Sequence, residues 1–301
     1  MEDGGGHVPV MRREVIEHLA PRPGHVVVDG TAGGGGHAEA IRPHLQPGGQ
    51  LILLDRDRGA LQRLMNRFGT PPDIRFFHAN FCDVDEVVCE AGHRQIDGCL
   101  ADLGVSSLQL GEAARGFSFD RPARLDMRYD RSQDLTADEV VNRWPAETLV
   151  EAIRTYGDQP FARRIVRAIV DARPVERTDD LAAIVADAVP AAWRRKQKIH
   201  PATRVMQAIR IVVNDELGSL RTFLDKIFPL LRPGGRLVVL AFHSGEDRIV
   251  KTRFREAARD GWVRLPVTRP LRPTPEEVEA NPRARSARLR VAERLPPAGL
   301  L

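Results

Sequence analysis

The chain has 301 residues, of which 42% are hydrophobic and 29% charged, a composition typical of globular rather than disordered proteins. Its formal net charge is +4, but the segment from Lys251 to the end holds 12 basic and 6 acidic residues and so carries +6. Three cysteines without CxxC spacing exclude a disulfide scaffold, and no apolar run approaches the roughly 18 residues of a membrane helix, so we expect a cytoplasmic protein without a membrane partner.

The predicted strands are short, continuous runs of Val, Leu and Ile. They are expected at residues 25–29, 50–55, 74–78, 96–102 and 236–242. Pro-Gly breaks precede three of them, and a helical pattern such as Arg58–Phe68 lies between neighbouring runs. Such runs suit strands buried on both faces of a parallel sheet, so the alternation predicts a doubly wound α/β domain.

The alternation stops after Asp102. The next hundred residues carry amphipathic helical patterns, which predict an all-helical insertion over residues 106–199. A single long helix is expected from about 203 to 228. Near the end, Arg288–Val291 alternates charged and apolar residues, as an antiparallel edge strand does. We therefore predict a first domain part over 1–105, the insertion, and a second part over 200–301 with a basic C-terminal arm that binds a polyanion.

The glycine loop Asp29–His37 (DGTAGGGGH) is the sharpest local signal. It directly follows a predicted strand and opens a helix, where glycines let the backbone approach a ligand closely. Asp55 ends the next strand about twenty residues later, the place from which a carboxylate reaches a ribose diol. Both nicotinamide dinucleotides and S-adenosylmethionine are bound by such an arrangement.

Two acidic residues bear on that choice. Asp29 precedes the loop and would repel a pyrophosphate, but it could meet the cationic amino group of S-adenosylmethionine. Asp102 ends the fourth predicted strand, and ligands of open α/β sheets bind outside the carboxyl ends of the strands. Both carboxylates could equally cap a turn or a helix, so the residues favour the methyl donor without excluding the dinucleotide.

Thirteen colinear motifs together resemble one family, the bacterial small-subunit ribosomal RNA cytosine-N4 methyltransferases, also called the MraW or RsmH family. The matching stretches are His7–Val10, Asp29–His37, Asp55–Asp57, Asn80–Phe81, Asp97–Leu110, Arg115–Phe119, Leu125–Arg128, Tyr156–Asp158, His200–Arg210, Asn214–Leu217, Pro233–Val239, Phe242–Lys251 and Asn281–Ala287. They run through essentially the whole chain, which makes the set far more specific than any one motif.

The resemblance implies an S-adenosylmethionine-dependent enzyme that methylates the exocyclic N4 amine of one cytidine in the decoding centre of 16S ribosomal RNA. It implies a Rossmann-like class I methyltransferase sheet interrupted by a helical substrate-recognition domain. The family's contacts to the methyl donor fall here on Gly35, Gly36, His37, Asp55, Phe81, Asp102 and Gln109. Asp102 is also the expected catalytic residue, because a carboxylate there could accept a hydrogen from the cytosine amine.

Some positions depart from the family pattern. Gly245 stands where leucine is usual in FHSLEDR, Leu108 replaces a proline, and Pro122–Arg124 replaces part of a DGP stretch. Phe117, Phe119 and Phe242 are candidates for stacking on the flipped base, although core packing is the commoner role of phenylalanine. No metal-ligand spacing accompanies His37 or His243, so we predict no metal site.

The expected partner is small-subunit ribosomal RNA within the assembled subunit, and a homodimer is a further expectation. Arginine clusters at 163–167 and the basic run 194–198 indicate RNA-backbone contacts in the helical insertion. Two alternatives stay open from the residues alone. One is a nicotinamide oxidoreductase, and the other is an RNA-binding ribosome-assembly factor without catalytic activity.

Overall fold

A computed structural model describes residues 9–197 and 199–297 of the chain, so His7, Val8 and Lys198 lie outside the described residues. The chain divides into two compact units. The first comprises Met1–Gly104 and Leu217–Leu301, and the second comprises Val105–Glu216. The predicted end of the helical insertion at residue 199 is therefore wrong. The next helix, α11 (Pro201–Val213), packs against α7 (Ala146–Gly157) and α9 (Thr178–Ala188) and so belongs to the insertion.

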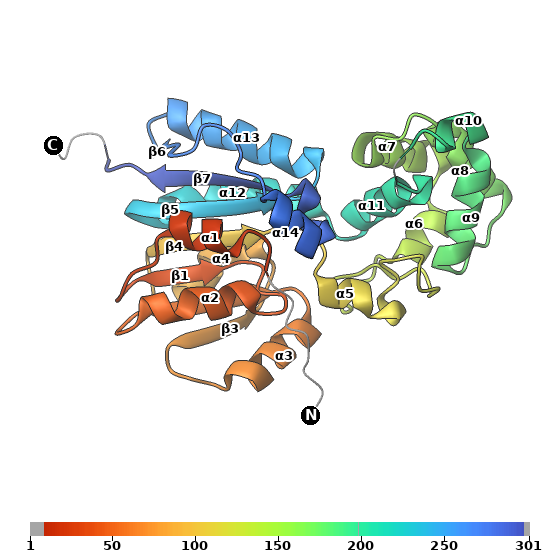
Figure 1. The fold of residues 1–301 in the computed structure, drawn as a ribbon. Helices are drawn as coiled ribbons and strands as arrows, with labels where there is room; N and C mark the ends of the chain where they lie inside the picture. The colour runs from red at the N-terminus through yellow and green to blue at the C-terminus, as the bar shows by residue number, and fades with distance from the viewer. Residues whose placement is uncertain (1–8, 198, 298–301) are drawn as a thin grey trace. The chain divides into compact units, whose positions relative to one another are not determined.

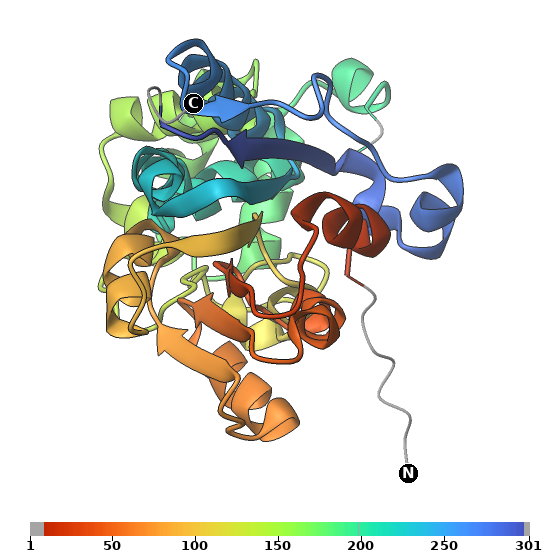
Figure 2. The same cartoon turned by 90° about the vertical axis from the view of Figure 1, so that its left-hand side faces the viewer.

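The first unit is built on a seven-stranded sheet in its described residues, with the order β3-β2-β1-β4-β5-β7-β6 (Figures 1 and 2). The strands are β1 (Val26–Asp29), β2 (Gln50–Asp55), β3 (Ile74–His78), β4 (Ile96–Asp102), β5 (Leu231–Ala241), β6 (Val263–Arg264) and β7 (Arg288–Arg294). The first five strands run parallel, and β7 runs antiparallel to β5 with the short β6 beyond it. The predicted parallel sheet with an antiparallel edge is confirmed.

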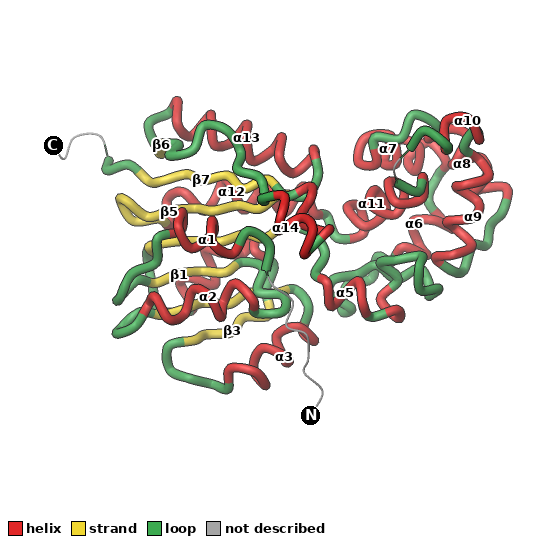
Figure 3. The backbone as a smooth tube through the Cα atoms, viewed as in Figure 1, coloured by secondary structure: helices red, strands yellow, loops and turns green. Residues whose placement is uncertain are grey.

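Helices cover both faces of this sheet (Figure 3). They are α1 (Arg12–Leu19), α2 (Gly36–Leu45), α3 (Arg58–Phe68), α4 (Val84–Glu90), α12 (Glu216–Leu230) and α13 (Ser244–Arg259), whereas the short α14 (Pro275–Ala280) has no buried residue. Successive strand residues serve opposite cores, because side chains of a strand alternate between its faces. Val27 packs in the core with α1, α2 and α3, whereas Val28 packs in the core with α4, α12 and α13. Burial on both faces explains the continuous apolar runs.

The C-terminal segment contributes β6 and β7 to the sheet and so is part of the first unit, and its binding of a polyanion stays a prediction. Arg288 and Arg290 in β7 each donate a hydrogen bond of 2.7 Å to Asp247 in α13. Burial alone would raise the pKa of Asp247, but these two guanidinium groups outweigh it and lower that pKa. Arg264 similarly pairs with Glu293 at 2.6 Å. These pairs offset only part of the local positive charge, since Arg269, Arg272, Arg283 and Arg285 are exposed and have no ion pair among the described residues.

The second unit is all-helical in its described residues. Its helices are α5 (Ser107–Gly111), α6 (Ala137–Arg143), α7, α8 (Ala162–Asp171), α9, α10 (Ala191–Arg194) and α11, with a 3-10 turn η2 (Ala113–Arg115). Their apolar faces enclose a separate core that includes Leu149, Ile165, Leu181 and Val205. None of the described helices, in either unit, is long and apolar enough to cross a membrane.

The single long helix predicted over residues 203–228 is wrong, because the chain breaks between α11 and α12. Asp215 adopts a left-handed conformation with φ 45, which ends the α-helical path. Asn214 fixes the break through its side chain, which accepts a 2.7 Å hydrogen bond from the Tyr129 amide and donates one of 2.8 Å to the Met127 carbonyl. The break thus depends on a loop more than eighty residues away in the sequence.

Candidate active site

Three carboxylates lie at the carboxyl ends of neighbouring strands. Asp55 ends β2, Asp29 ends β1 and Asp102 ends β4, and these strands are adjacent in the order β2-β1-β4. Neighbouring strands of a sheet lie about 4.8 Å apart, so the register brings the three residues to one edge. This is the edge at which open α/β sheets bind their ligands. The structure therefore brings together the acidic residues that the sequence analysis singled out.

The glycine loop is tied to the second of these carboxylates. The Gly33 amide donates a 2.8 Å hydrogen bond to one Asp55 oxygen, and the Asp57 amide donates one of 2.7 Å to the other. Gly35 comes just before α2 with φ 80, and a Cβ atom there would lie 2.5 Å from the Leu64 side chain. Only glycine fits this left-handed, closely packed position. The hydrogen bond to Asp55 and the close packing of Gly35 against Leu64 therefore hold the loop in one conformation.

Thr31 links the other two carboxylates and was missed by the sequence analysis. Its hydroxyl accepts a 2.6 Å hydrogen bond from the Asp102 amide, and its own amide donates one of 3.1 Å to Asp29. These contacts fix the end of β4 to the loop after β1. The only signal in the sequence is the position of Thr31 inside the glycine loop, since its partner lies 71 residues away.

Burial perturbs the acids at this edge. Loss of hydration is the main cause that raises the pKa of Asp29 to about 6; His37 and the Thr31 amide oppose the shift, and the charges of Asp102 and Asp55 add to it. Loss of hydration likewise raises the pKa of Asp55 to about 6, against the hydrogen bonds from Asp57 and Gly33. Carboxylates with raised pKa values at a strand edge are typical of functional sites.

His37 and Asp102 carry buried polar atoms that suit a ligand. The His37 Nε2 atom lies 3.5 Å from Asp102 Oδ2, and the His37 side chain is only 7% exposed. Neither ring nitrogen of His37 has a hydrogen-bond partner among the described residues, and neither does Asp102 Oδ1. Buried polar atoms in native proteins are normally paired, so these atoms are suited to contacts with a bound molecule.

This set of groups fits S-adenosylmethionine better than a dinucleotide. The methyl donor carries an ammonium, a sulfonium and a ribose diol but no phosphate. The edge offers the three carboxylates Asp29, Asp55 and Asp102, which would attract the cationic groups and repel a pyrophosphate. The unpaired Asp102 oxygen and the His37 nitrogens also fit the methyl donor, because they are buried polar atoms without a hydrogen-bond partner among the described residues.

Phe81 lies on the same unit, in the 3-10 turn η1 (Phe81–Asp83) that follows β3. Its ring meets Phe223 edge to face, with ring centroids 5.3 Å apart, and its Cβ lies 3.2 Å from where a Cβ would stand on Gly30. Asn80 anchors the turn by donating a 2.9 Å hydrogen bond to Ser219. The ring of Phe81 is half-buried and packs against Phe223 on one side. Its stacking on adenine stays a prediction.

Gln109 is the one predicted donor contact that falls in the helical unit. It completes a capping box at the start of α5. Its side-chain oxygen accepts a 3.0 Å hydrogen bond from the Ser106 amide, and its amide donates one of 3.2 Å to the Ser106 hydroxyl. The structure therefore gives Gln109 a local structural role, and its contact with the methyl donor stays a prediction.

The candidate stacking aromatics separate into different environments. Phe117 is part of the helical core and stacks on Tyr129 with ring centroids 5.4 Å apart. Phe119 packs on His200 at 4.9 Å. Phe242 belongs to the first unit and follows β5, where its ring lies 3.9 Å from where a Cβ would stand on Gly104. Of the three, Phe242 is the one on the same unit as the glycine loop.

Known proteins resemble this chain over nearly its full length. It is 47% identical over 312 residues to a protein named ribosomal RNA small subunit methyltransferase H from Nitratidesulfovibrio vulgaris, with 96% of this chain and 86% of that one covered. It is 46% identical over 292 residues to a protein of the same name from Synechococcus elongatus, with 97% and 95% covered.

Among solved structures, an rRNA methylase from Streptococcus thermophilus aligns with a TM-score of 0.44 at 11% identity, covering 95% of this chain and 94% of that one. This likeness is too low to carry an argument. Membership of a family does not depend on this likeness. The model of the MraW methylase family matches residues 5–295, and the sequence relatives and the strand order agree with it. The chain belongs to the MraW methylase family.

Proposed function

We propose that this protein methylates the exocyclic N4 amine of one cytidine in the decoding centre of 16S ribosomal RNA. At the coarser level it is an S-adenosylmethionine-dependent methyltransferase of the small-subunit ribosomal RNA methyltransferase H family. Family membership removes the nicotinamide alternative. The observation that carries the finer proposal is Asp102, whose Oδ1 is an unpaired acceptor at the strand edge beside the glycine loop.

The methyl donor would be held by the residues at this edge. Asp55 would accept hydrogen bonds from the ribose hydroxyls, Phe81 would stack on the adenine, and Gly35, Gly36 and His37 would line the donor where α2 begins. Bound S-adenosylmethionine supplies an electrophilic methyl group on a sulfonium centre. The chain's own contribution is to hold this site in one conformation, through the hydrogen bonds from Gly33 and Asp57 to Asp55.

Asp102 would act on the nucleophile. The lone pair of the cytosine amine is delocalised into the ring, so the amine attacks only when it is held in line and its hydrogens are accepted as it changes geometry. Asp102 Oδ1 is an acceptor fixed by the sheet, since the Asp102 amide is bound to Thr31 at 2.6 Å. Rate enhancement would then come mainly from positioning, with a smaller share from proton acceptance.

Donor affinity is expected to fall as the pH drops from 7 to 5. The pKa of Asp55 and that of Asp29 are both raised to about 6, so both side chains are mostly ionised at pH 7 and mostly protonated at pH 5. A neutral carboxyl group attracts the cationic donor less and accepts hydrogen bonds less well. We expect roughly tenfold weaker binding per protonated acid at pH 5, measured by calorimetry. An affinity that does not change over this range would contradict the assignment.

The proposed substrate is the ribosomal RNA within an assembled small subunit, in the cytoplasm, and we further propose that the enzyme is a homodimer. Mass spectrometry of small-subunit RNA from cells with and without this protein tests the reaction. We expect N4-methylcytidine at one decoding-centre position only when the protein is present. Purified small subunits that gain no methyl group from the enzyme and S-adenosylmethionine would favour the alternative of a non-catalytic assembly factor.

We propose that the helical unit contacts the RNA backbone through its exposed basic clusters. Phe161, just before α8, meets Trp193 of α10 edge to face with ring centroids 5.4 Å apart. This contact brings together two clusters that are separate in the sequence, and we call the set the arginine face. It consists of Arg163, Arg164, Arg167, Arg194, Arg195 and Lys196, all exposed. Among the described residues, no acidic side chain pairs with Arg163 or Arg164. Both guanidinium groups are therefore available to RNA phosphates.

RNA affinity is expected to fall steeply with salt and to depend on the arginine face. Each phosphate contact adds a little under one unit to the log–log slope of affinity against salt concentration. Replacing Arg163, Arg164 and Arg194 together with glutamine should therefore lower the slope by about 2–3 units. Binding titrations at several salt concentrations measure it.

A matched control replaces Arg143 and Arg154 with glutamine. These exposed arginines lie on α6 and α7 of the same unit and are paired with Glu139 and Glu151. We expect this variant to keep the wild-type slope. An arginine-face variant whose slope equals that of the control would refute the electrostatic role of this surface.

A further inference from the structure

His243 leaves the sheet at the same edge as Asp102. Asp102 in β4 pairs with Leu240 in β5, and the Leu103 amide donates a 3.0 Å hydrogen bond to the Leu240 carbonyl. His243 comes three residues after Leu240, as the residue immediately before α13. From the sequence, His243 is expected only to be part of a family motif, without a metal-binding role.

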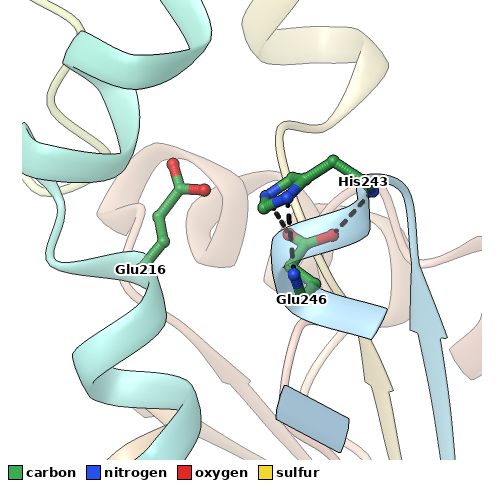
Figure 4. A group of neighbouring side chains, drawn as sticks. All are labelled: Glu216, His243 and Glu246. Atoms are coloured by element: carbon green, nitrogen blue, oxygen red, sulfur yellow. Dashed lines mark hydrogen bonds and ion pairs between the residues drawn. The ribbon is translucent and has the colours of Figure 1, made fainter. Parts of the chain in front are cut away.

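A reciprocal capping box holds the imidazole ring of His243 (Figure 4). The Glu246 amide donates a 3.4 Å hydrogen bond to His243 Nδ1. In return the Glu246 carboxylate accepts from the amides of Phe242, at 2.8 Å, and His243, at 3.2 Å. Glu216, also labelled in Figure 4, is described with the helical unit. Because Nδ1 accepts a hydrogen bond, the proton of a neutral ring is assigned to Nε2.

The Nε2 atom of His243 makes no hydrogen bond with good geometry to any described residue. The His243 side chain is only 12% exposed, and Nε2 has no hydrogen-bond partner among the described residues. Glu246 Oε1 lies 3.2 Å away but outside hydrogen-bond geometry. A buried donor without a partner is costly and uncommon, and in an enzyme it is suited to a substrate acceptor.

We propose that His243 Nε2 donates a hydrogen bond to the acceptor edge of the target cytosine and so directs its amine toward Asp102. This inference rests on the proposed cytosine-N4 activity. Cytosine presents a donor, the N4 amine, beside the acceptors N3 and O2, which matches an acceptor in Asp102 and a donor in His243. Uracil presents an oxygen and an N3–H in the first two places, so both contacts would be mismatched. The pair therefore selects cytosine over uracil.

Gly245 lies beside the imidazole ring of His243. A Cβ atom on residue 245 would lie 3.1 Å from His243 Nδ1 and 3.2 Å from the ring carbon Cε1. The departure from the family's leucine at this position therefore bears directly on the histidine ring.

The variant His243→Asn tests the proposal. Asparagine remains a strong residue for the position before a helix, but its shorter side chain cannot put a donor where Nε2 stands. With saturating donor, we expect kcat/KM for small-subunit RNA to fall about tenfold, with an unchanged dissociation constant for S-adenosylmethionine. His44→Asn is the matched control, because His44 is an exposed histidine of α2, and it should behave as wild type.

Base discrimination provides a readout that helix capping alone would not move. Wild-type enzyme should bind RNA with cytidine at the target position about tenfold more tightly than RNA with uridine there, and His243→Asn should lose this preference. His243→Ser, another good capping residue, serves if the asparagine variant does not fold. A folded variant with wild-type kcat/KM and wild-type preference overturns the proposal. Wild-type enzyme that forms no N4-methylcytidine would instead overturn the proposed function.

Discussion

Replacing Asp55 with alanine is expected to weaken S-adenosylmethionine binding by about 1–3 kcal/mol, or roughly five- to 150-fold, the scale of lost charge-assisted hydrogen bonds. Asp55 ends β2 and accepts the amides of Gly33 and Asp57, at 2.8 and 2.7 Å. Its remaining lone pairs are the acceptors expected to meet the ribose diol. The substitution therefore removes both the ribose contact and one anchor of the glycine loop. Isothermal titration calorimetry measures the change.

Two companion variants separate these contributions. Asp55→Asn keeps one acceptor oxygen but turns the other group into a donor, so its loss should fall between those of wild type and Asp55→Ala. Glu90→Ala removes an exposed acid at the end of α4 and should leave the affinity unchanged. An Asp55→Ala protein that binds the donor with wild-type affinity would remove Asp55 from the donor site.

The sheet was predictable because its physical cause is local. Strands buried on both faces must be apolar at every position, and the Pro-Gly breaks that follow α2 and α12 mark helix ends in the sequence itself. Parallel strands also bring their carboxyl ends to one edge. Asp29, Asp55 and Asp102 could therefore be assigned to one site from their positions at the strand ends alone.

The features that were missed depend on contacts between distant residues. The break at Asp215 interrupts an apolar period that continues through it, and it is fixed by Asn214 bonds to Met127 and Tyr129. No local pattern marks such a break, so the end of the helical unit could not be found either. Thr31 was missed for the same reason, because its partner Asp102 lies on another strand.

The charge of the C-terminal segment is a third case. Composition predicts a basic arm, but composition does not reveal which charges are paired. Asp247, which lies outside the segment, pairs with both Arg288 and Arg290, whereas Glu293, which pairs with Arg264, is already counted in the net charge of the segment. Exposed arginines without an ion pair among the described residues remain both in this segment, at Arg269, Arg272, Arg283 and Arg285, and on α8, at Arg163 and Arg164. The RNA-binding prediction is tested on the helical unit because the Phe161–Trp193 contact brings two basic clusters together there.

The variant Asp102→Asn is expected to lower the methylation rate by roughly 100-fold or more, the range for losing a positioned acid–base partner. Asp102 is fixed by β4 and by the hydrogen bond from its amide to Thr31, neither of which needs the carboxylate. The fold should therefore survive this nearly isosteric change. Asparagine would direct an amide donor, or a weaker acceptor, at the cytosine amine in place of the unpaired Oδ1.

Because Asp102 is also an expected donor contact, the rate is measured with saturating S-adenosylmethionine in single-turnover assays on small subunits, so that weaker donor binding is not counted as lost chemistry. Asp97→Asn is the matched control, since Asp97 lies at the opposite end of β4 and pairs with Arg232 at 2.9 Å. It should methylate at the wild-type rate despite losing an ion pair. If Asp102→Asn folds and matches that control, Asp102 only supports the strand end, and a backbone carbonyl beside it becomes the acceptor to test.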